Sequence, residues 1–299
     1  MHADTLTAEG ELQISKERLE QGGCVLQCLA AFVSSRTGRF RQAKLLADSF
    51  YEFCEKENIH PITDANLLPG VNAMLTVEEG GAIEGDLQKL EYLRGRGVKM
   101  MTLTWNYENE IGYPAFPDYE GLLKGKCPFT QREVERGLKP FGFECVERMN
   151  EIGMIVDVSH GSDQLLKDVA SVARKPFVAS HSGARSAFDT ARNLTDEDIG
   201  LIAKSGGVVG LYFCADFLSN DKSAEGQREA LLRHARAIVG AGGEDCLCIG
   251  SDFDGIPENP YLKNPSCMPD FLALLADEFG ERITEKIASG NFLRVLKEV

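Results

Sequence analysis

Eight short apolar runs alternate with longer amphipathic stretches along this 299-residue chain, and this alternation limits the possible folds more than any other feature. Most of the runs are continuously apolar, as expected for parallel strands that are buried on both faces. In chain order they are a short MHADT at the start, CVLQCLAAF from Cys24, AMLTVEE ending at Glu79, KMMTLTW ending at Trp105, MIVDVSH ending at His160, FVASHS around His181, GVVGLYF ending at Phe213 and CLCIGSDF ending at Phe253.

The segments between these runs carry apolar residues at helical spacing. The clearest are residues 39–58, 131–152, 162–174 and 219–241. Asp163 and Thr195 are candidate N-caps of the helices that follow them. Eight strands alternating with helices over about 250 residues or more predict a (β/α)8 TIM barrel. A doubly wound open sheet is the alternative, but neither of its usual phosphate loops, GxGxxG or GxxxxGK[ST], occurs in the chain.

The first apolar run has only Met1 before His2, which is too short to cross a barrel, so we expect a truncated first strand. No linker, low-complexity tract or long charge block divides the sequence. Residues 1–299 are therefore expected to form a single barrel domain.

The composition excludes several classes of protein. There are 32 basic and 46 acidic residues, and the net charge of −14 argues against a nucleic-acid or anionic-membrane partner. No apolar run approaches the roughly 20 residues of a membrane span, and the first residues do not resemble a secretory signal. The nine cysteines include no CxxC pair and are typical of buried reduced thiols. We therefore expect a cytoplasmic protein.

Titratable side chains gather at the carboxyl ends of the predicted strands, where the active site of a barrel enzyme lies. Three of the five histidines are among them. The residues at these ends are His2, Asp4, Glu79 with Glu78 beside it, His160, His181 and Asp252. Since side chains alternate along a strand, His2 and Asp4 point the same way and could reach one ion.

Imidazoles together with carboxylates favour Zn²⁺ or a similar borderline ion. Five protein ligands are too many for one catalytic zinc, but they suit a pair of ions about 3.5–4 Å apart, bridged by a carboxylate and a hydroxide. Such a pair lowers the pKa of the bridging water and polarises a carbonyl, which is the chemistry of hydrolysis. Asp252 is then the natural proton shuttle to the leaving amine.

Several blocks of the sequence resemble the zinc dipeptidases of the membrane or renal dipeptidase type, peptidase family M19, and in particular their bacterial members. These blocks are VDVSH, SHS, ARN and GSDFDG, in this order and spacing, and the resemblance extends from MHADTL to NFLRVLKE. It implies a barrel of the metal-dependent amidohydrolase type with two Zn²⁺ ions per chain. It also implies that the peptide bond of a dipeptide is hydrolysed by a metal-bound hydroxide, and that the chain forms a homodimer.

The resemblance also implies a role for individual residues. His2 and Asp4 would bind one zinc, His160 and His181 would bind the second, and Glu79, in the EGG block, would bridge the two ions.

Further residues are assigned to catalysis and substrate binding by the same resemblance. Asp252 would be the general acid and base, and the guanidinium fork of Arg192 would hold the substrate carboxylate, for which its geometry is suited. Tyr212 matches a tyrosine that lines the pocket, although a buried structural tyrosine is the alternative. Animal members have a histidine where this chain has Trp105, followed by Asn106, so Asn106 or the metals would stabilise the oxyanion.

The stretch 106–130 is rich in Tyr, Glu, Pro and Gly and is expected to form a lid that limits substrates to dipeptides or similarly small amides. Two other functions fit the same residues. One is another small-amide hydrolase, acting on N-acyl amino acids or lactams at the same centre. The other is a metal-binding scaffold without turnover.

Overall fold

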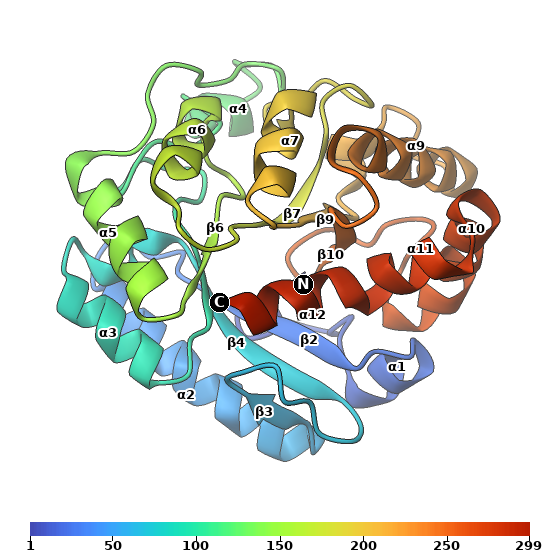
Figure 1. Ribbon diagram of the computed structural model, residues 1–299, viewed down its shortest axis with the longest axis horizontal. Coiled ribbons are helices and arrows are strands. Elements are labelled where there is room, and N and C mark those ends of the chain that lie inside the picture. The colour runs from blue at the N-terminus through green and yellow to red at the C-terminus, as the bar shows by residue number, and fades with distance from the viewer.

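The computed structural model describes residues 1–299 and contains ten β-strands, eight of which coincide with the eight apolar runs (Figure 1). The strands are β1 His2–Ala3, β2 Leu26–Phe32, β3 His60–Ile62, β4 Asn72–Glu78, β5 Met100–Thr102, β6 Ile155–Asp157, β7 Ala179–Ala184, β8 Asn193–Leu194, β9 Val209–Tyr212 and β10 Leu247–Phe253. As expected, the first strand is very short.

The strands pair in parallel and follow one another around a barrel. One sheet has the order β2-β4-β5-β6 and the other the order β1-β10-β9-β7, with β3 beside β4 and β8 beside β7. The two sheets meet between β6 and β7, where Val158 N donates to Val178 O at 2.8 Å and Val178 N donates to Val156 O at 2.9 Å. At the other junction β1 lies against β2. This is the predicted (β/α)8 barrel.

The fold has twelve helices, most of which surround the barrel on the outside, whereas the last one lies across one end of it (Figure 1). They are α1 Lys16–Gln21, α2 Arg39–Glu57, α3 Leu87–Gly95, α4 Tyr119–Leu123, α5 Pro140–Glu151, α6 Asp163–Val172, α7 Asp196–Lys204, α8 Ala215–Leu218, α9 Ala224–Gly242, α10 Met268–Phe279, α11 Glu281–Glu285 and α12 Asn291–Glu298. None of them is both long and apolar enough to cross a lipid bilayer.

The starts of three helices differ from the sequence prediction. The helix expected over 219–241 begins only at Ala224, because the Ser223 hydroxyl caps it there by accepting from Gly226 N. The helix expected over 131–152 begins only at Pro140, whose ring fixes φ and suits the first helical position. The N-cap of α6 is Ser162 and not Asp163, because the serine hydroxyl accepts the orphan N–H three residues on. Thr195 caps α7 as predicted, in a reciprocal capping box.

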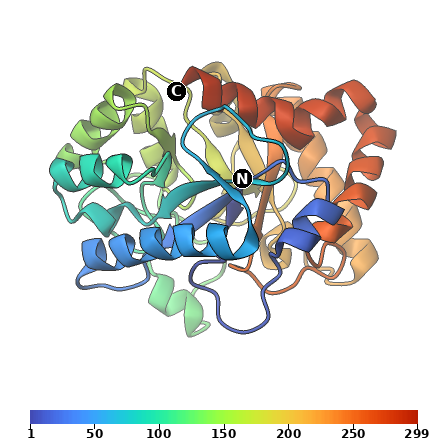
Figure 2. The ribbon, with the colours of Figure 1, turned by 90° about the horizontal axis from the view of Figure 1, so that it is seen from below.

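The amino-terminal end of the barrel is closed by an apolar layer. Side chains from inside the strands, such as Met74, Met100 and Ile155, pack there against Phe292 and Val295 of α12. Figure 2 shows α12 on one side of the barrel and α4 on the opposite side. The barrel is therefore open for chemistry only at the carboxyl ends of its strands.

Candidate metal centre

Five barrel strands bring six titratable side chains together at their carboxyl ends, each at most 9% exposed. They are His2 and Asp4 at β1, Glu78 at the end of β4, His160 after β6, His181 on β7 and Asp252 on β10. The sequence prediction named five of these six.

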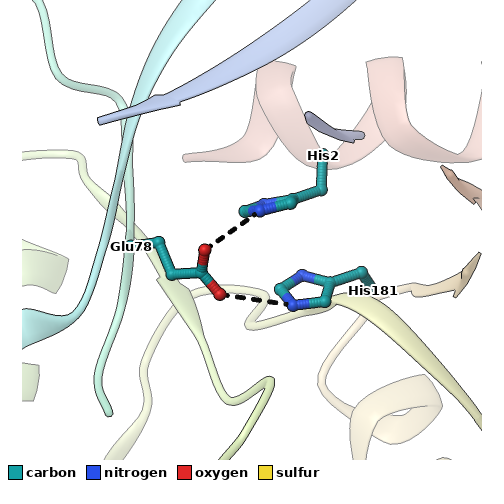
Figure 3. A group of neighbouring side chains, drawn as sticks. All are labelled: His2, Glu78 and His181. Atoms are coloured by element: carbon teal, nitrogen blue, oxygen red, sulfur yellow. Dashed lines mark ion pairs between the residues drawn. The ribbon is translucent and has the colours of Figure 1, made fainter. Parts of the chain in front are cut away.

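Glu78, and not Glu79, is the carboxylate at the centre of this cluster (Figure 3). Its Oε2 lies 3.3 Å from Nε2 of His2, while its Oε1 lies 3.1 Å from Nε2 of His160 and 3.4 Å from Nε2 of His181. The prediction that the Glu79 side chain lies among the histidines is therefore wrong. The next residue along a strand faces the opposite side, and Glu79 turns away from the barrel axis.

The alternation of β4 contains the signal that distinguishes the two glutamates. Ala73, Leu75 and Val77 belong to the core between strands and helices, whereas Met74 belongs to the layer inside the barrel. Side chains two residues apart share a face, so Glu78 shares the inward face of Met74. The position of Glu78 could thus have been predicted from this parity.

His160 and His181 present unprotonated Nε2 atoms to the cluster. His160 Nδ1 lies 2.8 Å from Asn106 Oδ1, which can only accept, so the proton is on Nδ1. Ser180 Oγ donates to the carboxylate of Asp157 and accepts from His181 Nδ1 at 2.8 Å, which fixes the same tautomer. Burial lowers the pKa of His160 to about 4 and that of His181 well below its usual value. Both imidazoles are therefore neutral near pH 7.

The Nε2 atoms of His160 and His181 are only 2.9 Å apart, and both face Oε1 of Glu78. Because both histidines carry their proton on Nδ1, the two Nε2 atoms and Oε1 of Glu78 face one another with lone pairs only. These three atoms therefore repel one another. A cation between the three atoms would turn each of them into a ligand, and imidazole with carboxylate is a donor set that zinc accepts.

The other side of Glu78 carries a second group of donors. His2 Nε2 lies 3.2 Å from Asp4 Oδ1 and 3.9 Å from Asp252 Oδ1, and neither ring nitrogen of His2 has a hydrogen-bond partner. Burial lowers the pKa of His2, but the nearby carboxylates of Glu78 and Asp4 raise it more. The pKa of His2 is therefore well above its usual value. Burial also raises the pKa of Asp4 to about 6. These donors likewise fit a cation.

The backbone is strained around the same cluster. Five of the seven non-glycine residues with positive φ lie where β4, β6 and β10 end. They are Glu79, His160, Ser251, Asp252 and Asp254. Such conformations cost about 1–3 kcal/mol each and concentrate at functional sites.

Arg192 and Tyr212 lie beside the cluster. Arg192 is buried, its Nη2 donates to His181 O at 3.2 Å, and its Nε has no partner. No carboxylate pairs with it, which is unusual for a buried guanidinium. The Tyr212 hydroxyl donates to Asn193 Oδ1 at 2.5 Å, and its ring lies 5.9 Å from the Arg192 guanidinium. Tyr212 thus supports Arg192 through its ring, while its hydroxyl is already bonded.

Trp105 and Asn106 begin the stretch that the sequence predicts to be a lid. The Trp105 ring lies 6.1 Å from that of His160 and contacts the rings of Phe32 and Tyr119. The stretch 106–130 has one short helix, α4, and is otherwise irregular. Its helix α4 lies on the side of the barrel opposite α12 (Figure 2).

An α/β barrel with histidines and carboxylates converging at its strand ends is typical of metal-dependent barrel enzymes. Within that class, the chain belongs to the family described as membrane dipeptidase, peptidase family M19, whose sequence profile matches residues 2–299. The protein is therefore a metal-dependent hydrolase that acts on dipeptides, as its sequence blocks predict.

Individual relatives agree with this assignment. The chain is 28% identical over 277 residues to an uncharacterized protein from the pqqA 5' region of Klebsiella pneumoniae, covering 92% of this chain and 94% of the relative. It is 32% identical over 228 residues to an uncharacterized dipeptidase of Schizosaccharomyces pombe, covering 75% of this chain and 52% of the relative. It is 28% identical over 302 residues to dipeptidase 3 of Rattus norvegicus, covering 96% of this chain and 58% of the relative.

Solved structures share the fold. A metallo-peptidase of family M19 named dipeptidase AC has a TM-score of 0.85 at 24% identity, with 99% of this chain and 96% of that chain covered. A metallo-peptidase from Rhodobacter sphaeroides, liganded with a phosphinate mimic of the dipeptide L-Ala-D-Ala, has a TM-score of 0.83 at 22% identity, with 99% and 97% covered.

Proposed function

We propose that this protein is a zinc-dependent dipeptidase that binds two Zn²⁺ ions per chain. His2 and Asp4 would hold one ion, His160 and His181 the other, and Glu78 both. The observation that carries the proposal is the position of the Glu78 carboxylate, whose two oxygens face two separate groups of donors. The tautomers of His160 and His181 support it, because both leave Nε2 free.

Two such ions, when bound, supply an activated water and a Lewis acid for a peptide carbonyl. Asp252 would move the proton to the leaving amine. Burial raises the pKa of Asp252 well above its usual value, which favours the protonated carboxyl group that a general acid needs. Asp252 Oδ1 lies 3.9 Å from Nε2 of the proposed metal ligand His2.

Arg192 would hold the carboxylate of the C-terminal residue of the substrate. Its buried guanidinium has an unused N–H and no carboxylate partner. Trp105 would form an apolar wall for the substrate. Asn106 would support His160 through its carbonyl oxygen, which accepts from that ring. Its Nδ2 group is a separate donor, so Asn106 or the metals would stabilise the oxyanion.

The proposal is tested by loading the protein with zinc, counting ions per chain, and comparing L,L- and L,D-dipeptides with N-acyl amino acids and a lactam. Hydrolysis of dipeptides with two zincs per chain supports it. Turnover of the acyl or lactam compounds alone would indicate a different amide hydrolase, and two bound zincs without any turnover would indicate a metal-binding scaffold. The single domain, the cytoplasmic location and the homodimer remain predictions.

A further inference from the structure

Glu79 is a buried carboxylate that points away from the metal ligands and is fully engaged. Its Oε1 accepts from Gly81 N at 2.8 Å and from Asn109 Nδ2 at 2.7 Å, and its Oε2 accepts from Trp105 N at 2.8 Å. Two of these donors belong to the segment after β5, which is 26 residues away along the chain. Glu79 therefore ties the end of β4 to that segment.

The backbone of Glu79 is unfavourable for a residue with a side chain. Its φ is 82° and its ψ is 91°, a conformation in which glycine has no steric cost. A glutamate there costs on the order of 1–3 kcal/mol and persists only when its surroundings hold it in place. The three hydrogen bonds of the carboxylate are what hold it.

The segment that Glu79 holds contains the residue that supports a proposed metal ligand. Asn106 follows directly after Trp105, and its Oδ1 accepts from His160 Nδ1 at 2.8 Å. On the opposite edge of that ring, Nε2 lies 3.1 Å from Oε1 of Glu78. The two adjacent glutamates thus act on His160 from two sides, Glu78 directly and Glu79 through Trp105 and Asn106.

We propose that Glu79 is a positioning residue, whose carboxylate holds the Trp105–Asn109 segment so that Asn106 fixes the tautomer and orientation of His160. The role of His160 as a metal ligand rests on the proposed function. The role of Glu79 in holding the Trp105–Asn109 segment does not depend on it. Partners of a metal-binding histidine typically change metal affinity by about 10–100-fold when they are lost. Because Glu79 acts one residue further out, we expect the lower end of this range.

The test compares Glu79→Gly with Glu84→Gly. Glu84 also has a positive φ, of 50°, and lies in the same turn, but its carboxylate accepts from Phe40 N and Lys89 instead. Both variants relieve a strained glutamate and add the same freedom to the unfolded chain. Since Trp105 is the only tryptophan, its emission and its quenching by acrylamide report the segment without metal or substrate.

In zinc-free protein, we expect Glu79→Gly to shift the Trp105 emission to the red and to increase quenching, while Glu84→Gly leaves both at the wild-type values. In zinc titrations, the ion held by His160 and His181 should bind about tenfold less tightly in Glu79→Gly than in the wild type. Wild-type quenching and affinity in Glu79→Gly, or equal changes in both variants, would overturn the proposal.

If Glu79→Gly does not fold, the same fluorescence and zinc measurements on Glu79→Gln test the proposal. The glutamine NH2 group cannot accept a hydrogen bond, so it would face the N–H of Trp105 or of Asn109 donor to donor and that bond would be lost. The Trp105 fluorescence could change as expected although the wild-type protein hydrolyses no dipeptide. That result would refute the proposed function but would still support the role of Glu79 in holding the Trp105–Asn109 segment. The two failures are thus distinguishable.

Discussion

If Arg192 holds the substrate carboxylate as proposed, wild-type protein prefers a substrate with a free C-terminal carboxylate, and replacing Arg192 by Met should remove that preference. Arg192 is 4% exposed, its Nε has no hydrogen-bond partner, and no carboxylate forms an ion pair with its guanidinium. Two charge-assisted hydrogen bonds to a substrate carboxylate, partly offset by desolvation, contribute about 3 kcal/mol. That loss corresponds to about 150-fold in kcat/KM.

The assay measures kcat/KM for a dipeptide and for the same dipeptide with a C-terminal amide, on wild-type and variant protein. The wild type should favour the free acid by about two orders of magnitude, and Arg192→Met should hydrolyse both at similar, low rates. The amide controls for general damage to the site, since damage lowers both rates together.

Arg185→Met is the matched control on the protein. Arg185 is also largely buried, but its guanidinium already makes a bidentate pair with Asp163 at 2.7 and 2.8 Å. Its removal should leave the ratio of acid to amide at the wild-type value. The assignment of Arg192 is refuted if Arg192→Met retains the wild-type ratio, or if both variants change it equally.

Three further predictions concern the centre and the core. Glu78→Gln should reduce bound zinc below one ion per chain, whereas Glu79→Gln should keep both ions, with weaker affinity at the site of His160. Equal zinc content of the two variants by atomic absorption would contradict this. Asp252→Asn should keep both zincs and lose turnover by at least about 100-fold, the usual scale for a proton-transfer residue, and loss of zinc would instead make Asp252 a ligand. Burial lowers the pKa of His234 to about 4, so the folded state binds its proton less tightly than the unfolded state. His234 should therefore contribute about 3 kcal/mol of stability that is present above pH 6.5 and lost as the pH falls to about 4. Urea unfolding of the metal-free, chelated protein measures this stability. Between pH 6.5 and about 4, His234→Gln should lose less unfolding free energy than the wild type, and the same pH dependence in both proteins would refute the assignment.

The barrel could be predicted from sequence because strands buried on both faces read as uninterrupted apolar runs. The helix boundaries were harder to predict from the sequence than the strands. Residues 131–139 carry helical periodicity, but the antiparallel bridge between Gly112 and Leu138 and the ring of Pro140 delay the start of α5. Such a contact depends on chain segments that are distant in sequence, and no local pattern reveals it.

The site was predicted in its residue types but not in all of its positions. A motif containing two adjacent glutamates does not distinguish Glu78 from Glu79, whereas the alternation of β4 does. The support of His160 by Asn106 was also missed, because the two residues are 54 positions apart and meet only when β5 and β6 pair. Neutral tautomers at His160 and His181 follow from hydrogen bonds that sequence alone does not contain.

The most direct test of the account is X-ray diffraction from zinc-loaded crystals, with anomalous data collected at the zinc edge. The account predicts two anomalous peaks about 3.5–4 Å apart, with the Glu78 carboxylate between them. His2 and Asp4 should lie at one peak, and His160 and His181 at the other. A single peak, or two peaks that do not share Glu78, would contradict it.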